Sequence, residues 1–194
     1  SPTELLIGTE KHSYILNTDN YSLQVTPKKK EVNQNEKSSP DSSWIAYSED
    51  FNLFIKSADG KLVKQLSSSG KEGYEYASWY GWYDIMEGEN GVRPEHFNVS
   101  WSEDSEWIHA NICDLRIAQK MYLLDWSVDT LYRPRLLSYY RGSPGDTTMV
   151  YTEPVFFHVP SGKEIKPDLP RSTHINEIQV EWSANPGKVY LTRF

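Results

Sequence analysis

The chain has 194 residues, a formal net charge of −7 and 38% hydrophobic residues, so it is long enough to bury a core in one or two domains. The negative charge argues against nucleic acid as a partner, and no stretch approaches the roughly 20 apolar residues of a membrane span. The 7 Trp, 13 Tyr and 6 Phe residues favour strands over helices. The single cysteine, Cys113, has no partner for a disulfide within the chain.

The beginning of the chain predicts a pair of strands followed by a loop. After a short apolar start at Leu5–Gly8, the segments Ser13–Asn17 and Tyr21–Val25 have strand composition and flank a polar turn at 18–20. Residues 27–38 are polar, charged and without periodicity, so we expect them to form a loop.

The stretch that starts at Ser39 predicts the clearest structural unit. Three short apolar segments follow one another at Trp44–Tyr47, Asn52–Ser57 and Lys61–Leu66. The last two are separated by Asp59-Gly60, a dipeptide that strongly favours a hairpin turn. Together with a strand that leads into Ser39, they predict a four-stranded antiparallel meander, which is the structural unit of a propeller blade.

One phrase of the sequence occurs twice in full and once in part, as SPDSSWIAY, WSEDSEWIHA and WSANPGKVYL. Each copy has an apolar run that closes in Ser, then a polar turn, then a new apolar run. A repeated strand–turn–strand unit indicates a repeat architecture. Ser39, Ser102 and Ser183 lie 63 and 81 residues apart, which exceeds the roughly 40 to 45 residues of a bare blade and predicts insertions.

The later strands are expected to form two further units. We expect the second to comprise Phe97–Trp101, Trp107–Ile112, Lys120–Trp126 and Arg135–Tyr140. We expect the third to comprise Glu153–Pro160, Lys163–Ile165, Glu177–Trp182 and Lys188–Phe194. The sequence thus predicts an all-β chain, with about four antiparallel four-stranded blades that form a partial β-propeller over residues 1–194.

Residues 67–97 interrupt this pattern with an insertion that is rich in aromatic and acidic residues. Its aromatic cluster consists of Tyr74, Tyr76, Trp79, Tyr80, Trp82 and Tyr83. Long loops on rigid scaffolds often carry function, so this cluster is either a ligand platform or the contact that packs the insertion onto the blades. Asp84, Glu87 and Glu89 form either a solvated acidic turn or an edge that binds an amine.

The ordered set of motifs resembles the propeller of the dipeptidyl peptidase IV branch of the prolyl oligopeptidase family. Besides the repeated phrase, Lys11–Tyr14 resembles the family's Arg-His-Ser motif, and Gly70–Tyr83 resembles the segment that leads to its glutamate motif. Tyr139–Val159 resembles the family's Tyr-Pro-Lys-x-Gly stretch and the strand after it. The resemblance covers nearly the whole chain. Because such propellers have eight blades, it implies that this chain holds about half of one.

The resemblance also implies that catalysis belongs to a different domain. Members of the family carry a separate α/β-hydrolase domain with a Ser-Asp-His triad. This chain contains no Gly-x-Ser-x-Gly nucleophile elbow, and Gly142–Gly145 does not fit that spacing. We therefore expect no catalytic residue in this chain, and we expect it to be a piece of a longer protein, since it begins at Ser1 without Met.

A pair of glutamates in the family's propeller binds the free α-amino group of the substrate. In this sequence the two glutamate positions of the Trp-x-Tyr-Glu-Glu pattern fall on Ile85 and Met86. Asp84, Glu87 and Glu89 are then the candidates for binding the amine, since an ammonium group needs acidic acceptors. Lys11 stands where the family has an arginine that contacts the substrate carbonyl, and it keeps the charge but loses the fork geometry.

Two functional hypotheses follow from these motifs. The first is the propeller portion of a serine peptidase, which gates and orients peptides with a free amino terminus for the hydrolase domain of the parent chain. The second is a non-enzymatic propeller for protein interaction, from a homologue that lost peptidase activity. A weaker third is a substrate-binding propeller of another periplasmic or surface system.

Other properties follow from the composition and from the resemblance. We expect no cofactor, and no metal, because His12 and His96 lack partners at ligand spacing. The resemblance favours a periplasmic or extracellular location. Because a partial propeller has open blade edges, we also expect the chain to associate with itself.

Overall fold

The computed structural model describes residues 4–8, 13–26, 35–127, 133–143, 145–185 and 187–193. These residues form strands, turns and irregular segments, with no helix among them, so none of them forms a helix long and apolar enough to cross a membrane. The chain divides into two compact units, Ser1–Gln34 and Asn35–Phe194. The all-β fold class is therefore confirmed.

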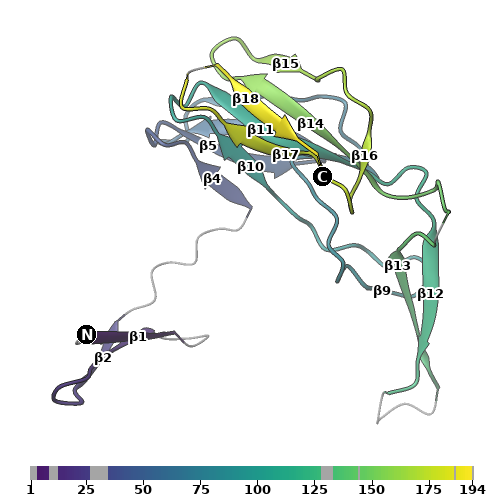
Figure 1. The fold of residues 1–194 in the computed structure, drawn as a ribbon, viewed down its shortest axis with the longest axis horizontal. Coiled ribbons are helices and arrows are strands. Elements are labelled where there is room, and N and C mark those ends of the chain that lie inside the picture. Colours follow the sequence, from purple (N-terminus) through teal and green to yellow (C-terminus); the bar gives the residue numbers. More distant parts are fainter. Residues whose placement is uncertain are drawn as a thin grey trace. The chain divides into compact units, whose positions relative to one another are not determined.

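The first unit is a small antiparallel sheet with the order β1–β2–β3 (Figure 1). Its strands are β1 (Glu4–Gly8), β2 (Ser13–Asn17) and β3 (Leu23–Thr26). The turn between β2 and β3 is held by Asn17, whose side-chain oxygen accepts hydrogen bonds from the backbone N–H groups of Asp19 at 2.9 Å and Asn20 at 3.2 Å. The predicted pair of strands is therefore confirmed.

The second unit begins with a four-stranded antiparallel meander. Its strands are β4 (Glu36–Ser38), β5 (Trp44–Glu49), β6 (Asn52–Ser57) and β7 (Val63–Gln65). Gly60 has a φ of 73° in the predicted turn between β6 and β7, a conformation that glycine adopts at little cost. The loop predicted over 27–38 ends earlier than expected, because Glu36–Ser38 pairs with β5; residues 27–34 lie outside the described ranges.

The next sheet has the strand order β10–β11–β14–β15. Its strands are β10 (Val99–Trp101), β11 (Trp107–Asp114), β14 (Tyr151–His158) and β15 (Lys163–Ile165). Two short strands extend it: β8 (Tyr74–Tyr76) pairs with β11, and β16 (Ser172–Thr173) pairs with β14. The sequence-based grouping was wrong here, because β11 pairs over eight residues with β14 and not with the segment that begins at Lys120.

The segment between β11 and β14 forms a hairpin of its own. β12 (Lys120–Asp125) pairs with β13 (Arg135–Tyr140), and β13 also pairs with the short strand β9 (Met86–Glu87). Figure 1 shows this hairpin extending away from the stacked sheets of the same unit. Burial is consistent with β14, and not β12, as the partner of β11. Leu123 and Leu124 in β12 are each 52% exposed, whereas Val155 and Phe157 in β14 are fully buried.

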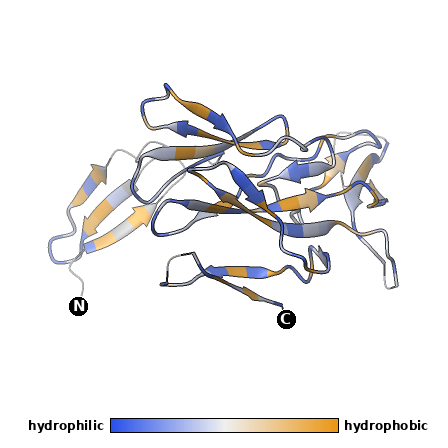
Figure 2. Ribbon diagram, turned by 90° about the horizontal axis from the view of Figure 1, so that it is seen from above, coloured by the Kyte–Doolittle hydropathy of each residue, from blue (hydrophilic) through white to orange (hydrophobic). Residues whose placement is uncertain are grey.

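The last strands, β17 (Gln179–Trp182) and β18 (Val189–Thr192), form a two-stranded antiparallel sheet. It packs beside β10 and β14, because the Trp182 indole donates a hydrogen bond to Ser100 Oγ at 3.1 Å and lies edge-on to Phe156. In Figure 2 this C-terminal hairpin lies to one side of the longer strands. The third predicted unit therefore contains β17 and β18 but not β14 and β15, which belong to the second.

The repeated phrase forms the same turn in both full copies. Ser39 Oγ donates to Asp41 Oδ1 at 2.6 Å and accepts the Trp44 N–H at 3.0 Å. In the second copy, Ser102 Oγ donates to Asp104 Oδ1 at 2.5 Å and accepts the Trp107 N–H at 2.9 Å. The serine that directly follows each aspartate takes a left-handed backbone conformation, with φ of 61° at Ser42 and 62° at Ser105.

Adjacent sheets of the second unit share one apolar core. Ala46, Leu53 and Ile55 from the first meander pack with residues of the next sheet, which are Val99, Trp101, Ile108, Ala110, Ile112, Val155 and Phe157. The two repeated turns also contact each other, since the Asp41 N–H donates to Ser105 Oγ at 3.1 Å. This stacking of antiparallel sheets is the arrangement of a partial β-propeller.

We predict that the 194-residue chain associates with itself. The β17–β18 sheet has two strands, and a two-stranded sheet is only marginally stable in water. Its Tyr190 side chain is 60% exposed, so pairing with a second copy would cover both apolar surface and free backbone groups. Size-exclusion chromatography with light scattering should give a mass that rises with concentration, and a constant monomer mass across micromolar concentrations would contradict the prediction.

Candidate functional site

The insertion between β7 and β10 is organised by one arginine. The Arg93 guanidinium donates through Nη1 to the Trp79 carbonyl at 3.0 Å and to Asp84 Oδ2 at 3.2 Å. Through Nη2 it donates to the Glu75 carboxylate and to Ser78 Oγ. The side chains of Arg93, Glu75 and Asp84 are only 10%, 14% and 4% exposed, so these are buried ion pairs. We call Glu75, Asp84, Arg93 and His96 the Arg93 cluster.

Asp84 makes two further contacts besides its ion pair with Arg93. Its Oδ1 lies 2.6 Å from His96 Nε2, and its Oδ2 accepts the Gly81 N–H at 3.0 Å. The His96 ring stacks on the Trp79 ring with centroids 4.0 Å apart. A Cβ at Gly81 would lie 2.8 Å from Asp84 Oδ1, so this close approach requires glycine. Although burial opposes its charge, the carboxylates of Glu75 and Asp84 hold the pKa of Arg93 above its ordinary value.

An acidic cleft of about 700 Å³ opens beside this cluster. It is lined by the turn between β5 and β6, by residues of the insertion and by the base of the β12–β13 hairpin. Its acidic residues are Glu49, Asp50, Glu72, Glu75 and Glu95, and its lysine and arginine residues are Arg93 and Lys120. Because Arg93 is already paired with Glu75 and Asp84, the cleft favours a positively charged ligand over an anionic one.

The structure does not bring the predicted site residues together. Asp84 is buried in the Arg93 cluster, whereas Glu87 and Glu89 are exposed and do not line the acidic cleft. Glu87 lies in β9 opposite Leu137, and the Glu89 carbonyl accepts a hydrogen bond from Lys120 Nζ at 2.9 Å. Lys11 lies outside the described residues.

The two positions on which the resemblance places the glutamates, Ile85 and Met86, differ in their surroundings. Ile85 is 52% exposed, whereas Met86 is 3% exposed and lines the acidic cleft. A carboxylate at position 86 would therefore face the cleft, whereas the methionine side chain is uncharged. Whether Asp84, Glu87 or Glu89 takes over amine binding stays a prediction.

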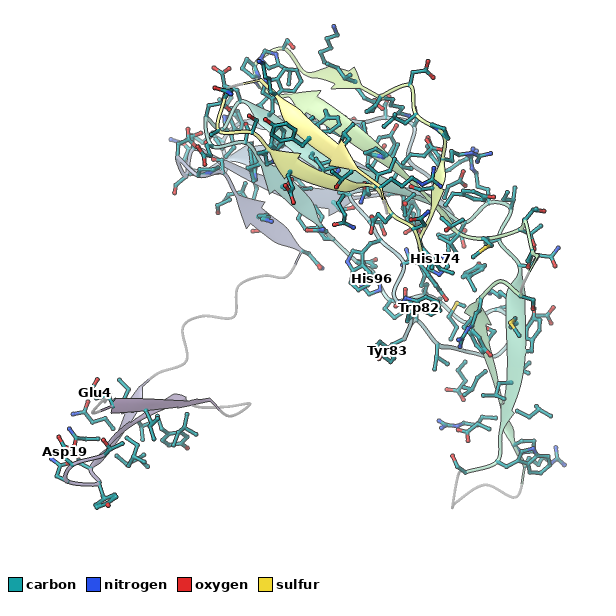
Figure 3. All side chains as sticks on the ribbon, in the orientation of Figure 1. Glu4, Asp19, Trp82, Tyr83, His96 and His174 are labelled. Carbon is teal, nitrogen blue, oxygen red and sulfur yellow. The ribbon has the colours of Figure 1, made fainter. Side chains whose placement is uncertain are left out.

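The aromatic cluster of the insertion separates into a packed part and an exposed part. Tyr76 and Tyr80 are 1% and 7% exposed, and burial raises the pKa of Tyr80 to about 12. Trp82 and Tyr83 are 51% and 92% exposed, and Figure 3 shows both in the region between the stacked sheets and the hairpin. Trp82 contacts the Arg141 guanidinium, 5.3 Å from its ring centroid, and the His174 ring.

Sequence reasoning missed Arg93, Glu75 and His96, which hold the insertion in place. The sequence does contain one indication of this role for Arg93, which is the only basic residue in the acidic stretch 84–97 apart from His96. A lone arginine among carboxylates is a natural partner for them, since its planar fork can serve two acceptors at once.

We predict that Arg93→Met lowers the free energy of unfolding by about 3 to 5 kcal/mol, because it leaves Glu75 and Asp84 buried without a counter-ion. Urea unfolding followed by circular dichroism measures this change. The control Arg133→Met, at an exposed position, should cost less than about 0.5 kcal/mol. A loss at Arg93 as small as that of the control would contradict the assignment.

Comparison with known proteins gives a fold and no close relative. No protein-family model matches the chain, and no curated protein matches it. Solved structures do match, among them a Bacteroides ovatus protein assigned as dipeptidyl aminopeptidase IV and dipeptidyl peptidase 4 of Porphyromonas gingivalis. They are 16% and 17% identical to the chain, with TM-scores of 0.55 and 0.59 over 100% and 98% of its length. The chain spans about a quarter of each structure (25% and 26%), and it has the fold of that part of a dipeptidyl peptidase IV.

Proposed function

We propose that this chain is the propeller portion of a dipeptidyl peptidase IV-like serine peptidase. In this role it gates and orients peptides with a free amino terminus for a hydrolase domain elsewhere in the parent protein. The observation that carries the proposal is the likeness to two dipeptidyl peptidase IV structures over 98% to 100% of the chain. At 16% to 17% identity this likeness establishes the fold, and the activity is an inference from it.

The charges of the insertion support the proposal. Apart from the Arg93–Glu75 pair, the acidic cleft is lined by four carboxylates and by one lysine, Lys120. The exposed carboxylates of Glu87 in β9 and of Glu89 in the turn after it lie in the same insertion. A peptide with a protonated amino terminus is the substrate class that such a surface attracts.

A second candidate function is a binding scaffold without peptidase activity. It is favoured by Ile85 and Met86, which stand at the glutamate positions, and by Asp84, whose carboxylate is already occupied by Arg93 and His96. In this case the parent would bind a protein or peptide partner through the propeller and would not cleave it.

We predict that the full-length parent cleaves Gly-Pro and Ala-Pro chromogenic dipeptides and does not cleave amino-terminally blocked versions. If Glu87 or Glu89 binds the amine, Glu87→Gln or Glu89→Gln should lower kcat/KM about 10- to 100-fold, which corresponds to the loss of one charge-assisted hydrogen bond. The control Glu103→Gln, at an exposed position in the turn before β11, should leave kcat/KM unchanged.

Two outcomes separate the candidate functions. A folded parent without turnover would contradict the peptidase and favour the scaffold. Turnover that is equal for free and blocked substrates would contradict an amine-binding propeller while leaving the hydrolase in place.

A further inference from the structure

A second pocket, of about 200 Å³, lies on the face of the β10–β11–β14 sheet that is turned away from the shared apolar core. Its lining includes Ser100 from β10, His109 and Asn111 from β11, and His174 and Glu177 from the segment after β16. Tyr80 and its neighbour Trp79 contribute aromatic surface from the insertion. This volume is well above the roughly 10 to 15 Å³ that one water needs, so the pocket has room for several waters or one small organic molecule.

The strand β11 has two faces of opposite character at this point. Ile108, Ala110 and Ile112 are at most 1% exposed and pack into the shared apolar core. The alternate residues His109 and Asn111 line the pocket instead. Burying polar side chains costs free energy unless each finds a partner, so a polar pocket on this face of β11 favours a polar occupant.

The two histidines of the pocket have unused hydrogen-bonding capacity. His174 Nδ1 lies 3.4 Å from the Val150 carbonyl, which can only accept, so Nδ1 carries the proton. Burial lowers the pKa of His109 to about 4, and it also lowers the pKa of His174 from its ordinary value, so burial favours the neutral form of both rings. The Nε2 atom of each ring is buried without a partner among the described residues, and in His174 it is an acceptor.

Glu177 brings the only carboxylate among the described residues that line this pocket. Its carboxylate accepts a hydrogen bond from the Asn111 amide, and no cationic side chain of the described residues pairs with it. Burial raises the pKa of Glu177, as expected for a carboxylate that has lost water without gaining a counter-ion.

We propose that this pocket binds a small organic cation with a primary ammonium group, which pairs with Glu177 and lies against the aromatic surface of Trp79 and Tyr80. An ammonium donates three hydrogen bonds, so it serves the carboxylate and an imidazole acceptor at the same time. Aromatic faces attract cations as well. An anion would be repelled by Glu177, and a neutral molecule would leave its charge uncompensated. The proposal concerns a small molecule between the β10–β11–β14 sheet and the segment that carries His174 and Glu177, and it holds whether or not the parent cleaves peptides.

Calorimetric titration of the full-length protein with n-butylammonium chloride at neutral pH tests the proposal, with 1-butanol as the uncharged probe of similar size. We expect saturable binding of the amine and at least about tenfold weaker binding of the alcohol, as for the loss of one charge-assisted interaction. Equal binding of the two probes, or no saturation up to about 10 mM amine, would overturn the proposal.

Variants locate the binding site within the protein. Glu177→Gln should weaken binding of n-butylammonium at least about tenfold. Glu181→Gln, an exposed glutamate in the neighbouring strand β17, should bind within about twofold of the unaltered protein. His174→Phe, which removes the free acceptor and keeps a ring, tests the site a second way if Glu177→Gln does not fold. Unchanged binding in the folded Glu177→Gln and His174→Phe variants would overturn the assignment. Because the readout is heat of binding, its failure is distinct from a failure of the peptidase assay.

Discussion

The guanidinium of Arg93 lies between two buried carboxylates, and the conformation of the insertion depends on these ion pairs. Glu75 lies in β8, which pairs with β11. Asp84 lies just before β9, which pairs with β13. One side chain therefore connects the blade sheet to the base of the projecting hairpin. Buried ion pairs contribute little net stability, but removing one partner is costly, so such a cluster fixes one conformation more than it adds free energy.

The same cluster decides which charges remain for a ligand. Asp84 is occupied by Arg93 and His96, so its carboxylate positions the insertion. The acidic cleft keeps carboxylates such as Glu49 and Glu95 without an ion pair among the described residues, and its field favours cationic groups. On the other face of the neighbouring sheet, Glu177 has no counter-ion in the described part of the chain. Positively charged or amine-bearing ligands are the common expectation for both pockets.

Much of the fold was predictable because the local sequence determines it. The repeated turn needs Ser and Asp at fixed positions to accept and donate the turn's hydrogen bonds, and Ser39, Asp41, Ser102 and Asp104 supply them. The Asp59-Gly60 turn was predictable for the same reason. The order of the strands was not, because β11 pairs with β14 across the β12–β13 hairpin, and nothing local distinguishes a blade strand from a hairpin strand of similar composition.

The site was less predictable than the fold, because its charged residues come together from segments that are far apart in the sequence. The sequence places Asp84, Glu87 and Glu89 close together, but one is buried in ion pairs and the other two are exposed on β9 and the turn after it. Glu177 and His174 reach their pocket from a segment about 65 residues beyond Asn111.

Hydrogen exchange of Arg93→Met, measured by mass spectrometry, tests the central role of the Arg93 cluster most directly. The account predicts that peptides covering residues 74–97 lose more protection than peptides from β5 and β6, because the shared apolar core does not include the ion pairs. Unchanged exchange over 74–97, or an equal loss in β5 and β6, would contradict the view that Arg93 holds the insertion on the blades.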